Sequence, residues 1–329
     1  MSTIFGLDGR TIESEVVRAG VDVNDIDATI VTHLHFDHAG GLTRRAREGE
    51  EADWVASKPG AASGDCNDVK FTFPNAELIT QRREWVDARN NDSVMTRTYY
   101  RDHLLPFEDE RMPLSDGRPR LRLIDSARPF PLNRKPSRNE LPKNTLDERM
   151  TEVLPGIRVF LVPGHTWGQQ AIQFEDEQGR TITFTSDVMP THYHIGQPYS
   201  LGYDVEPYTS MVTKHWFLKE ASERDWILVL DHDPGNPCFR VKTNDKGWFD
   251  LVEEDCGILK RNPSRRTNRT PNPVRPRLLL TLINSEPMLL LRRQRRSPPN
   301  RRRNHSLSVL RPLFRVFPRG TSSGIGFVR

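Results

Sequence analysis

Seven side chains of the types that bind transition metals occur in this chain just after short apolar runs. Four of them lie in THLHFDHAGG, and the others lie in VPGHTWG, TSDVMP and LDHDPG. In chain order they are His33, His35, Asp37, His38, His165, Asp187 and His232. Imidazole nitrogen and carboxylate oxygen are ligands that zinc prefers, and a catalytic zinc keeps one position open for water. The set therefore predicts a hydrolytic metal centre.

The runs that precede these residues are rich in β-forming side chains, at 28–32, 157–162, 181–185 and 227–230. Such runs predict buried strands. If the strands belong to one α/β sheet, their ends lie along a common edge, where loops carry functional groups on a rigid support. The placement thus predicts one cleft. Solvated loop residues, or a folded but inactive site, are the alternatives, and neither explains the strand-end positions.

Two ions fit this set better than one. His33 and His35 point the same way by the period-two rule of strands, whereas Asp37 and His38 can turn toward a second ion. Two-metal hydrolytic sites hold their ions about 3.5 to 4 Å apart, and a carboxylate such as Asp187 can bridge them. We expect two Zn²⁺, although His and Asp ligands also suit Mn, Fe or Co.

With these residues, HLHFDH followed by a later His, Asp and His, the chain resembles the metallo-β-lactamase superfamily of αββα hydrolases over about residues 11–241. The resemblance implies that His33, His35 and His165 bind the first zinc. It also implies that Asp37, His38 and His232 bind the second zinc, and that Asp187 bridges the two.

Within that superfamily, the segments 73–85, PGHTWGQQ, SDVMPTH and LDHDP are similar to the branch of N-acyl-homoserine lactonases and related quorum-quenching lactonases. Phosphotriesterase-like members are neighbours of this branch. Its members carry a Tyr three residues after the bridging Asp, where this chain has Pro190. His192, Tyr193 and His194 follow in the same loop and are candidates for the missing hydrogen-bond donor. Ordinary loop packing is the alternative for each.

The expected mechanism uses no protein nucleophile. A hydroxide held between two zinc ions would attack the carbonyl, one ion would stabilise the developing charge, and the other would receive the departing ring oxygen. Asp37 is the natural proton carrier to that oxygen. The candidate catalytic residues are thus Asp37, His192, Tyr193 and His194.

Charge divides the chain into a catalytic domain, residues 1–256, and an Arg/Pro-rich tail, residues 257–329. From Lys260 onward there are 17 Arg and one Lys against Glu286, a net charge of +17, so the remainder carries −13 of the total of +4. The composition of the tail predicts a disordered segment. Three interpretations stay open: a solvated segment without a role, a misread gene end, or an arm that attracts nucleic acid without sequence specificity. Its apolar stretch, 278–291, is shorter than the roughly 20 residues of a membrane span.

Only 32 residues precede His33, so N-terminal strands of the αββα sandwich are expected to be missing and a sheet edge to be open. The spacing of apolar residues predicts a helix over 11–19, a strand over 71–80, and helices over 81–90 and 207–222. In the 81–90 helix, Trp85 and Val86 are expected on the inner face. Residues 106–146 predict an insertion, either a lid beside the cleft or a surface loop.

Three cysteines without a CxxC pair predict no disulfide framework. Because the N-terminal residues show no leader pattern, we expect a cytoplasmic protein.

The sequence favours a dinuclear zinc hydrolase of small lactones or esters, N-acyl-homoserine lactones being one candidate. A metallo-β-lactamase-fold nuclease or a phosphotriesterase-like hydrolase is the alternative. A non-enzymatic alternative is an inert metallo-domain whose basic tail binds nucleic acid. We expect a small-molecule partner and no membrane, and the oligomeric state stays open.

Overall fold

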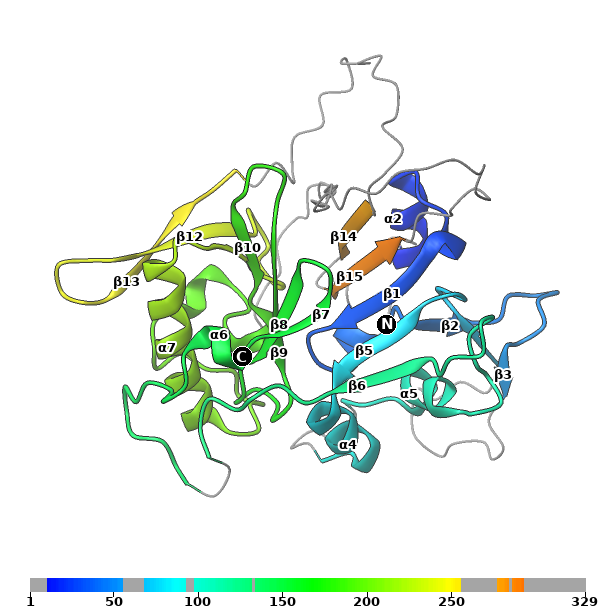
Figure 1. Ribbon diagram of the computed structural model, residues 1–329, viewed down its shortest axis with the longest axis horizontal. Helices are drawn as coiled ribbons and strands as arrows, with labels where there is room; N and C mark the ends of the chain where they lie inside the picture. The colour runs from blue at the N-terminus through cyan, green and yellow to red at the C-terminus, as the bar shows by residue number, and fades with distance from the viewer. Residues whose placement is uncertain are drawn as a thin grey trace, which may run out of the picture.

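The computed structural model describes residues 11–55, 68–92, 98–131, 134–255, 277–283 and 286–292. Two β-sheets face each other in the centre, and helices cover their outer faces (Figure 1). The helices are α2 (Ile12–Arg18), α3 (Phe36–Ala39), α4 (Arg82–Asn90), α5 (Arg101–Glu108), α6 (Leu146–Arg149) and α7 (Pro207–Glu223). Three 3-10 helices, η1 (Val23–Asp25), η2 (Ser186–Val188) and η3 (His192–Ile195), lie in connections.

The two large sheets differ in the part of the chain that builds them. The seven-stranded sheet comes from the second half and has the order β13 (Phe249–Glu253), β12 (Cys238–Thr243), β11 (Ile227–Val229), β10 (Thr181–Phe184), β9 (Gln170–Glu175), β8 (Ile157–Leu161), β7 (Thr151–Leu154). The five-stranded sheet has the order β14 (Arg277–Ile283), β15 (Glu286–Arg292), β1 (Ile26–Val31), β5 (Glu77–Gln81), β6 (Leu121–Ile124). A small sheet joins β2 (Thr43–Arg45), β4 (Asp68–Phe71) and β3 (Trp54–Val55).

Alternation along the strands produces three apolar layers. Ile30 of β1 packs between the two sheets, whereas its neighbour Val31 packs under the helices α2, α4 and α5. In β11, Val229 faces the other sheet, and Leu228 faces α7. Successive strand side chains point to opposite faces, so a strand that is apolar at every position is buried on both sides. The predicted αββα fold is therefore confirmed.

The predicted helices form, with one error in orientation. Thr11 caps α2 through a capping box, accepting from the backbone N–H of Ser14 while the Ser14 hydroxyl closes the box. In α4, Trp85 is buried as expected, but Val86 is 45% exposed. The expectation for Val86 was wrong because adjacent helical positions diverge by about 100°, so only one of the two can face the core.

The structure divides two of the expected segments, the insertion at 106–146 and the strand at 71–80, into separate elements. The chain of the insertion contributes β6, which pairs in parallel with β5, and then α6. Phe130 and Leu146 pack in the apolar layer beneath α7. Residues 72–76 turn between β4 and β5 instead of continuing one strand. Tertiary pairing thus makes an edge strand of a segment whose Pro and Arg content predicts an irregular excursion.

Two segments of the basic tail are strands, and the rest of the predicted disordered tail lies outside the described residues. β14 and β15 pair as an antiparallel hairpin, and β15 pairs antiparallel with β1 over Ile26 to Val31. The edge of β1 that we expected to be open is therefore paired. Cys238 is disulfide-bonded, which the expectation of no disulfide framework did not include.

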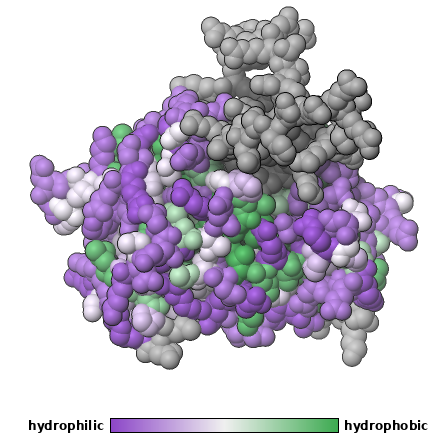
Figure 2. All heavy atoms as spheres, viewed as in Figure 1, coloured by the Kyte–Doolittle hydropathy of each residue, from purple (hydrophilic) through white to green (hydrophobic). Residues whose placement is uncertain are grey.

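Figure 2 shows that the face seen in Figure 1 is mainly hydrophilic, with hydrophobic residues gathered in a central strip. In the part of the chain that the structure describes, no helix has both the length and the apolar character needed to cross a bilayer.

Candidate metal centre

The turn that follows β1 carries the first four candidate ligands. β1 ends at Val31, His33 and His35 follow in extended chain, and the single-turn helix α3 then presents Asp37 and His38. The three imidazoles are buried, and Asp37 keeps partial exposure. His33 and His35 lie two residues apart in extended chain, so their side chains point to the same side. The helical turn that begins at Phe36 then directs Asp37 and His38 toward the same space.

The other three candidate ligands come from the opposite sheet. His165 follows β8, Asp187 lies in η2 after β10, and His232 follows β11. We expected the ligands along the edge of one sheet, but they come from two sheets that face each other. Strand ends of both sheets reach the same rim of the sandwich, so the cleft lies between the layers. Periodicity does not reveal which strands share a sheet.

Local features hold the His165 and Asp187 loops. Gly164 packs so closely on the first turn of α7 that a Cβ atom at this position would lie 2.4 Å from the backbone N of Ser210. The N–H of Glu206 also donates to the carbonyl of Gly164 at 2.9 Å. Ser186, next to Asp187, adopts a left-handed conformation with φ 54°. Such a conformation is unfavourable for a residue other than Gly and is often found at functional sites.

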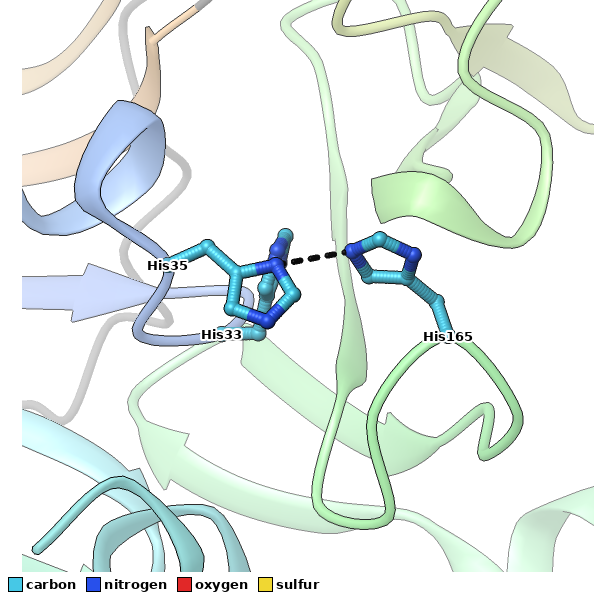
Figure 3. Close-up of side chains that lie close together, drawn as sticks. All are labelled: His33, His35 and His165. Atoms are coloured by element: carbon cyan, nitrogen blue, oxygen red, sulfur yellow. Dashed lines mark hydrogen bonds between the residues drawn. The ribbon is translucent and has the colours of Figure 1, made fainter. Parts of the chain in front are cut away.

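His33, His35 and His165 form one group of possible metal ligands. The His33 ring lies 4.6 Å from the His35 ring and 4.8 Å from the His165 ring, centroid to centroid. His35 Nδ1 and His165 Nε2 are 2.9 Å apart. Figure 3 shows that His33 and His35 come from one loop and that His165 approaches from the opposite side.

Asp37, His38 and His232 form a second group, and Asp187 lies between the two groups. The Nε2 atoms of His38 and His232 are 3.2 Å apart. Asp187 Oδ1 is 3.1 Å from His232 Nε2 and 3.5 Å from His38 Nε2, whereas its Oδ2 is 3.2 Å from His165 Nε2. The two oxygens of one carboxylate thus face the two groups, which is the arrangement of a bridging ligand.

Burial and charge set the protonation states of the candidate ligands. Burial, followed by the neighbouring imidazoles, lowers the pKa of His33 and of His35 well below the usual value. Burial alone would raise the pKa of Asp187, but His232, His165 and His38 outweigh it and hold that pKa well below its usual range. Neutral His33 and His35 beside an ionised Asp187 are forms that coordinate divalent metals. At His165 and His232, burial is outweighed by Asp187, which raises the pKa of His165 and raises that of His232 to about 9, so a metal must displace protons there.

Unpaired atoms in the centre support the same conclusion. His33 Nε2 and His35 Nε2 are buried and have no hydrogen-bond partner among the described residues. A buried polar atom without a partner is destabilising, so such atoms in a native fold require an explanation. A divalent metal ion supplies one, and the nitrogen and oxygen donors here suit a transition metal.

Residues that contact the imidazoles fix their orientation. Asp204 Oδ1 lies 2.9 Å from His165 Nδ1, and Thr32 Oγ1 lies 3.3 Å from Nδ1 of both His33 and His38. A carboxylate on the outer ring nitrogen sets the tautomer and strengthens the metal ligand. Asp204 was absent from the sequence predictions, because it lies 39 positions from His165 and no local pattern connects the two.

The three candidate catalytic residues of η3 lie in different surroundings. His192 Nδ1 is 2.5 Å from Asp233 Oδ2, and its ring contacts that of Tyr193 at 3.8 Å between centroids. Tyr193 is 68% exposed. His194 contacts the Thr191 hydroxyl and lines a narrow recess together with Asp187. Roles for His192, Tyr193 and His194 stay predictions.

Aromatic rings surround the centre on two sides. Phe36 stacks on Tyr100 with 5.6 Å between ring centroids, and Tyr203 approaches His165 edge to face at 5.6 Å. Burial, then Asp187 and Asp37, raise the pKa of Tyr203, so its hydroxyl stays protonated. This side chain is therefore a hydrogen-bond donor beside the metal centre.

Comparison with protein families matches residues 6–232 to the metallo-beta-lactamase superfamily, more than half of the chain. The chain belongs to this superfamily. The fold family implies a divalent metal, and the seven side chains described above fit that requirement.

Similarity to individual proteins of the superfamily is lower. The N-acyl homoserine lactonase AiiA of Bacillus thuringiensis subsp. kurstaki is 25% identical over 219 residues, which are 66% of this chain and 59% of the lactonase. Among solved structures, a probable metal-dependent hydrolase from Staphylococcus aureus has a TM-score of 0.50 at 20% identity, covering 74% of this chain and 68% of that one. A hydrolase of the beta lactamase superfamily, AbOPH, has a TM-score of 0.50 at 16% identity, covering 74% and 69%. The structures support the fold alone.

Proposed function

We propose that this protein is a dinuclear metal-dependent hydrolase that opens a small lactone or ester, with N-acyl-homoserine lactones as the first candidate substrates. The position of Asp187 carries the proposal, because its two oxygens face two separate groups of imidazoles. The 25% identity to an N-acyl homoserine lactonase supports the choice of substrate. Divalent ions held there, zinc in our proposal, would supply Lewis-acid chemistry and would activate water for attack on a carbonyl.

Each ligand has a defined task in this proposal. His33, His35 and His165 hold the first ion. Asp37, His38 and His232 hold the second, and Asp187 bridges them.

Asp37 also carries a proton in this proposal. Its Oδ2 lies 3.9 Å from His38 Nε2, and its side chain is 28% exposed against 3% for Asp187. A carboxylate at the open side of the centre can pass a proton to the leaving oxygen. We expect Asp37→Ala to remove nearly all turnover, and near-normal rates with intact metal content would contradict this role.

Tyr203 replaces the missing tyrosine in our proposal. Pro190 stands at that tyrosine's position, and its carbonyl accepts a hydrogen bond from the N–H of His232 at 2.9 Å, so it serves the metal loop. Tyr203, beside His165, can donate to the substrate instead. We expect Tyr203→Phe to lower kcat/KM about tenfold, the value of one hydrogen bond of about 1.4 kcal/mol. Tyr193→Phe tests the donor that the sequence suggests, and Tyr208→Phe, at a ring that packs against Lys135, serves as the matched control.

A substrate panel on zinc-reconstituted protein tests the function. Acyl-homoserine lactones, aryl esters and phosphotriesters are compared by kcat/KM, and bound metal is counted by mass spectrometry. We expect two equivalents of metal and the highest kcat/KM with a lactone. Fewer than two equivalents in wild-type protein would contradict the dinuclear centre, and a preference for phosphotriesters would favour the phosphotriesterase-like alternative.

The nuclease alternative has a separate test. The catalytic part carries a charge of −13, which repels a polyanion, whereas the tail carries +17. Deleting every residue after Arg292, which keeps the β14–β15 hairpin on β1, should reduce any nucleic-acid affinity and leave esterase turnover unchanged. RNA cleavage that requires the tail would instead favour a nuclease, and nucleic-acid binding without any hydrolysis would favour an inert metallo-domain. A cytoplasmic location stays a prediction.

A further inference from the structure

Glu84 is a buried carboxylate that the proposed mechanism does not use. It lies in the first turn of α4 and has no exposed surface. Its Oε1 accepts from the backbone N–H of Leu34 at 2.9 Å, and its Oε2 accepts from the hydroxyl of Thr166 at 2.6 Å. Leu34 stands between His33 and His35, and Thr166 follows His165. One carboxylate therefore connects the two loops that carry the first group of imidazoles.

The loop of His165 also rests directly on the backbone at Glu84. A Cβ atom at Gly168 would lie 2.2 Å from the backbone N and 2.5 Å from the Cα of Glu84. No side chain fits at that distance, so position 168 requires Gly if α4 is to stay in place. The start of α4 is thus fixed against one histidine loop by packing and against the other by a hydrogen bond.

An apolar residue at position 84 could not accept the hydrogen bonds from Leu34 and Thr166. Burying a carboxylate is unfavourable unless it accepts hydrogen bonds. If Glu84 is removed, the Leu34 N–H and the Thr166 hydroxyl are both left in a buried space without their acceptor. The two loops come from opposite sheets, and this side chain is a direct polar connection between them.

We infer that Glu84 is a positioning residue that sets the separation of the His33–His35 loop and the His165 loop, and thereby the affinity of the first metal position. The inference rests on the proposed metal centre. Glu84 itself contacts no metal or substrate. Its effect passes through Leu34 and Thr166 to the imidazoles beside them.

Substitutions at Glu84 and at a matched position separate positioning from general stability. Asp87 lies on the same helix and is also buried, but it pairs with Arg83 at 2.7 Å and contacts neither loop. We expect Glu84→Ala to weaken one of the two metal equivalents about 10- to 100-fold, the range found when partners of metal ligands are lost. Asp87→Ala should lower the melting temperature and leave both metal affinities within about threefold of wild type.

A conservative variant provides the rescue. In Glu84→Gln the amide oxygen can still accept from Leu34 and the amide N–H can donate to the Thr166 oxygen, so metal affinity should stay within about threefold of wild type. Thr166→Val removes the hydroxyl at nearly constant volume and should weaken the same metal equivalent as Glu84→Ala. If Glu84→Ala fails to fold, the comparison of Glu84→Gln with Thr166→Val decides the question.

The measurements are made on the full chain without substrate. Metal affinity comes from Co²⁺ and Zn²⁺ titration against a competing chelator, the ligand geometry from the Co²⁺ absorption spectrum, and stability from melting of the metal-free protein. The spectrum of Glu84→Ala should change, whereas that of Asp87→Ala should match wild type. If wild type binds two ions and neither Glu84→Ala nor Thr166→Val weakens one, only this inference is overturned. If wild type binds no metal, the proposed function fails as well.

Discussion

His33 and His35 are buried imidazoles whose Nε2 atoms have no hydrogen-bond partner among the described residues. Elsewhere in the described core, buried polar side chains such as Gln169 and Gln170 have protein partners. Other buried polar atoms, at Arg149 and Trp216, do not, so the centre is distinguished by its imidazoles gathered around Asp187 and not by unpaired atoms alone. At the residue scale the site is therefore a set of donors arranged for a cation and held from behind by Asp204, Thr32 and Glu84.

Asp204 provides a first prediction. Asp204→Asn replaces the carboxylate that faces His165 Nδ1 at 2.9 Å by a neutral amide, which no longer increases the basicity of the imidazole. We expect metal affinity to fall about 10- to 100-fold. Chelator competition measures the affinity, and Asp176→Asn, at a buried carboxylate in the turn between β9 and β10 that contacts Arg180, is the control. An unchanged dissociation constant would show that Asp204 does not support the ligand.

Lys214 gives a prediction about pH. It is buried in α7 and donates to the carbonyl of Tyr199, and burial, opposed by Asp204, lowers its pKa to about 8 from 10.5. Because the unfolded chain binds the proton more tightly, the native state is destabilised below pH 8, and this cost disappears as the pH rises from 8 to 10.5. At about 1.4 kcal/mol for each unit of pKa shift, the change is about 3 kcal/mol.

The measurement compares wild type with Lys214→Met. The free energy of unfolding of wild type, minus that of the variant, should rise between pH 8 and pH 10.5 in urea denaturation. A difference that stays constant over this range would mean that the ammonium is solvated in the native state.

At the scale of elements, strands with apolar residues on both faces produce the architecture. Such strands pack on both faces, so β1, β8 and β11 lie inside a four-layer molecule, and their ends carry His33, His165 and His232 to one rim. The antiparallel pairing of β15 with β1 belongs to the same scale. It joins a segment of the tail to the strand that precedes the metal ligands.

The hairpin of β14 and β15 leads to a prediction about truncation. A chain that ends at residue 276 lacks both strands, whereas a chain that ends at 292 retains them. We expect the shorter chain to melt at least roughly 5 °C lower, because several hydrogen bonds of about 1 kcal/mol each are lost along β1. It should also aggregate more readily, since an unpaired strand edge is exposed. Equal melting temperatures in scanning calorimetry would show that the hairpin does not stabilise β1.

At the scale of the whole molecule, charge is separated along the chain, with −13 before Lys260 and +17 from Lys260 onward. The centre itself is a concentration of buried polar groups between two apolar sheets. Metal binding couples such a centre to global stability, because an ion that binds only the folded state stabilises it.

Metal removal is the corresponding prediction. An ion at 1,000 times its dissociation constant stabilises the fold by about 4 kcal/mol, so chelation should lower the melting temperature by roughly 10 °C. Readdition of Zn²⁺ should restore it, and Asp187→Ala should show a smaller difference with and without chelator. A melting temperature that does not depend on the chelator would contradict a metal site within the folded core.

The sequence by itself determined the elements that local chemistry controls. A run of mainly apolar, β-forming residues such as 28–31 or 227–230 predicts a buried strand wherever that strand lies, and the spacing of His33, His35 and His38 predicts metal-binding chemistry at its end. The helix of Thr11 and the family resemblance follow from equally local patterns. Such features depend on residues that are close in the chain, so the sequence displays them.

Only the tertiary structure decided which distant residues meet. It divided the ligands between two facing sheets, placed β15 beside β1, and brought Asp204 to His165 and Glu84 to Leu34 and Thr166. It also turned Val86 to solvent and made a strand of 121–124. These outcomes depend on contacts between residues tens of positions apart, which side-chain periodicity does not encode, because any buried strand satisfies the same pattern whichever neighbour it pairs with.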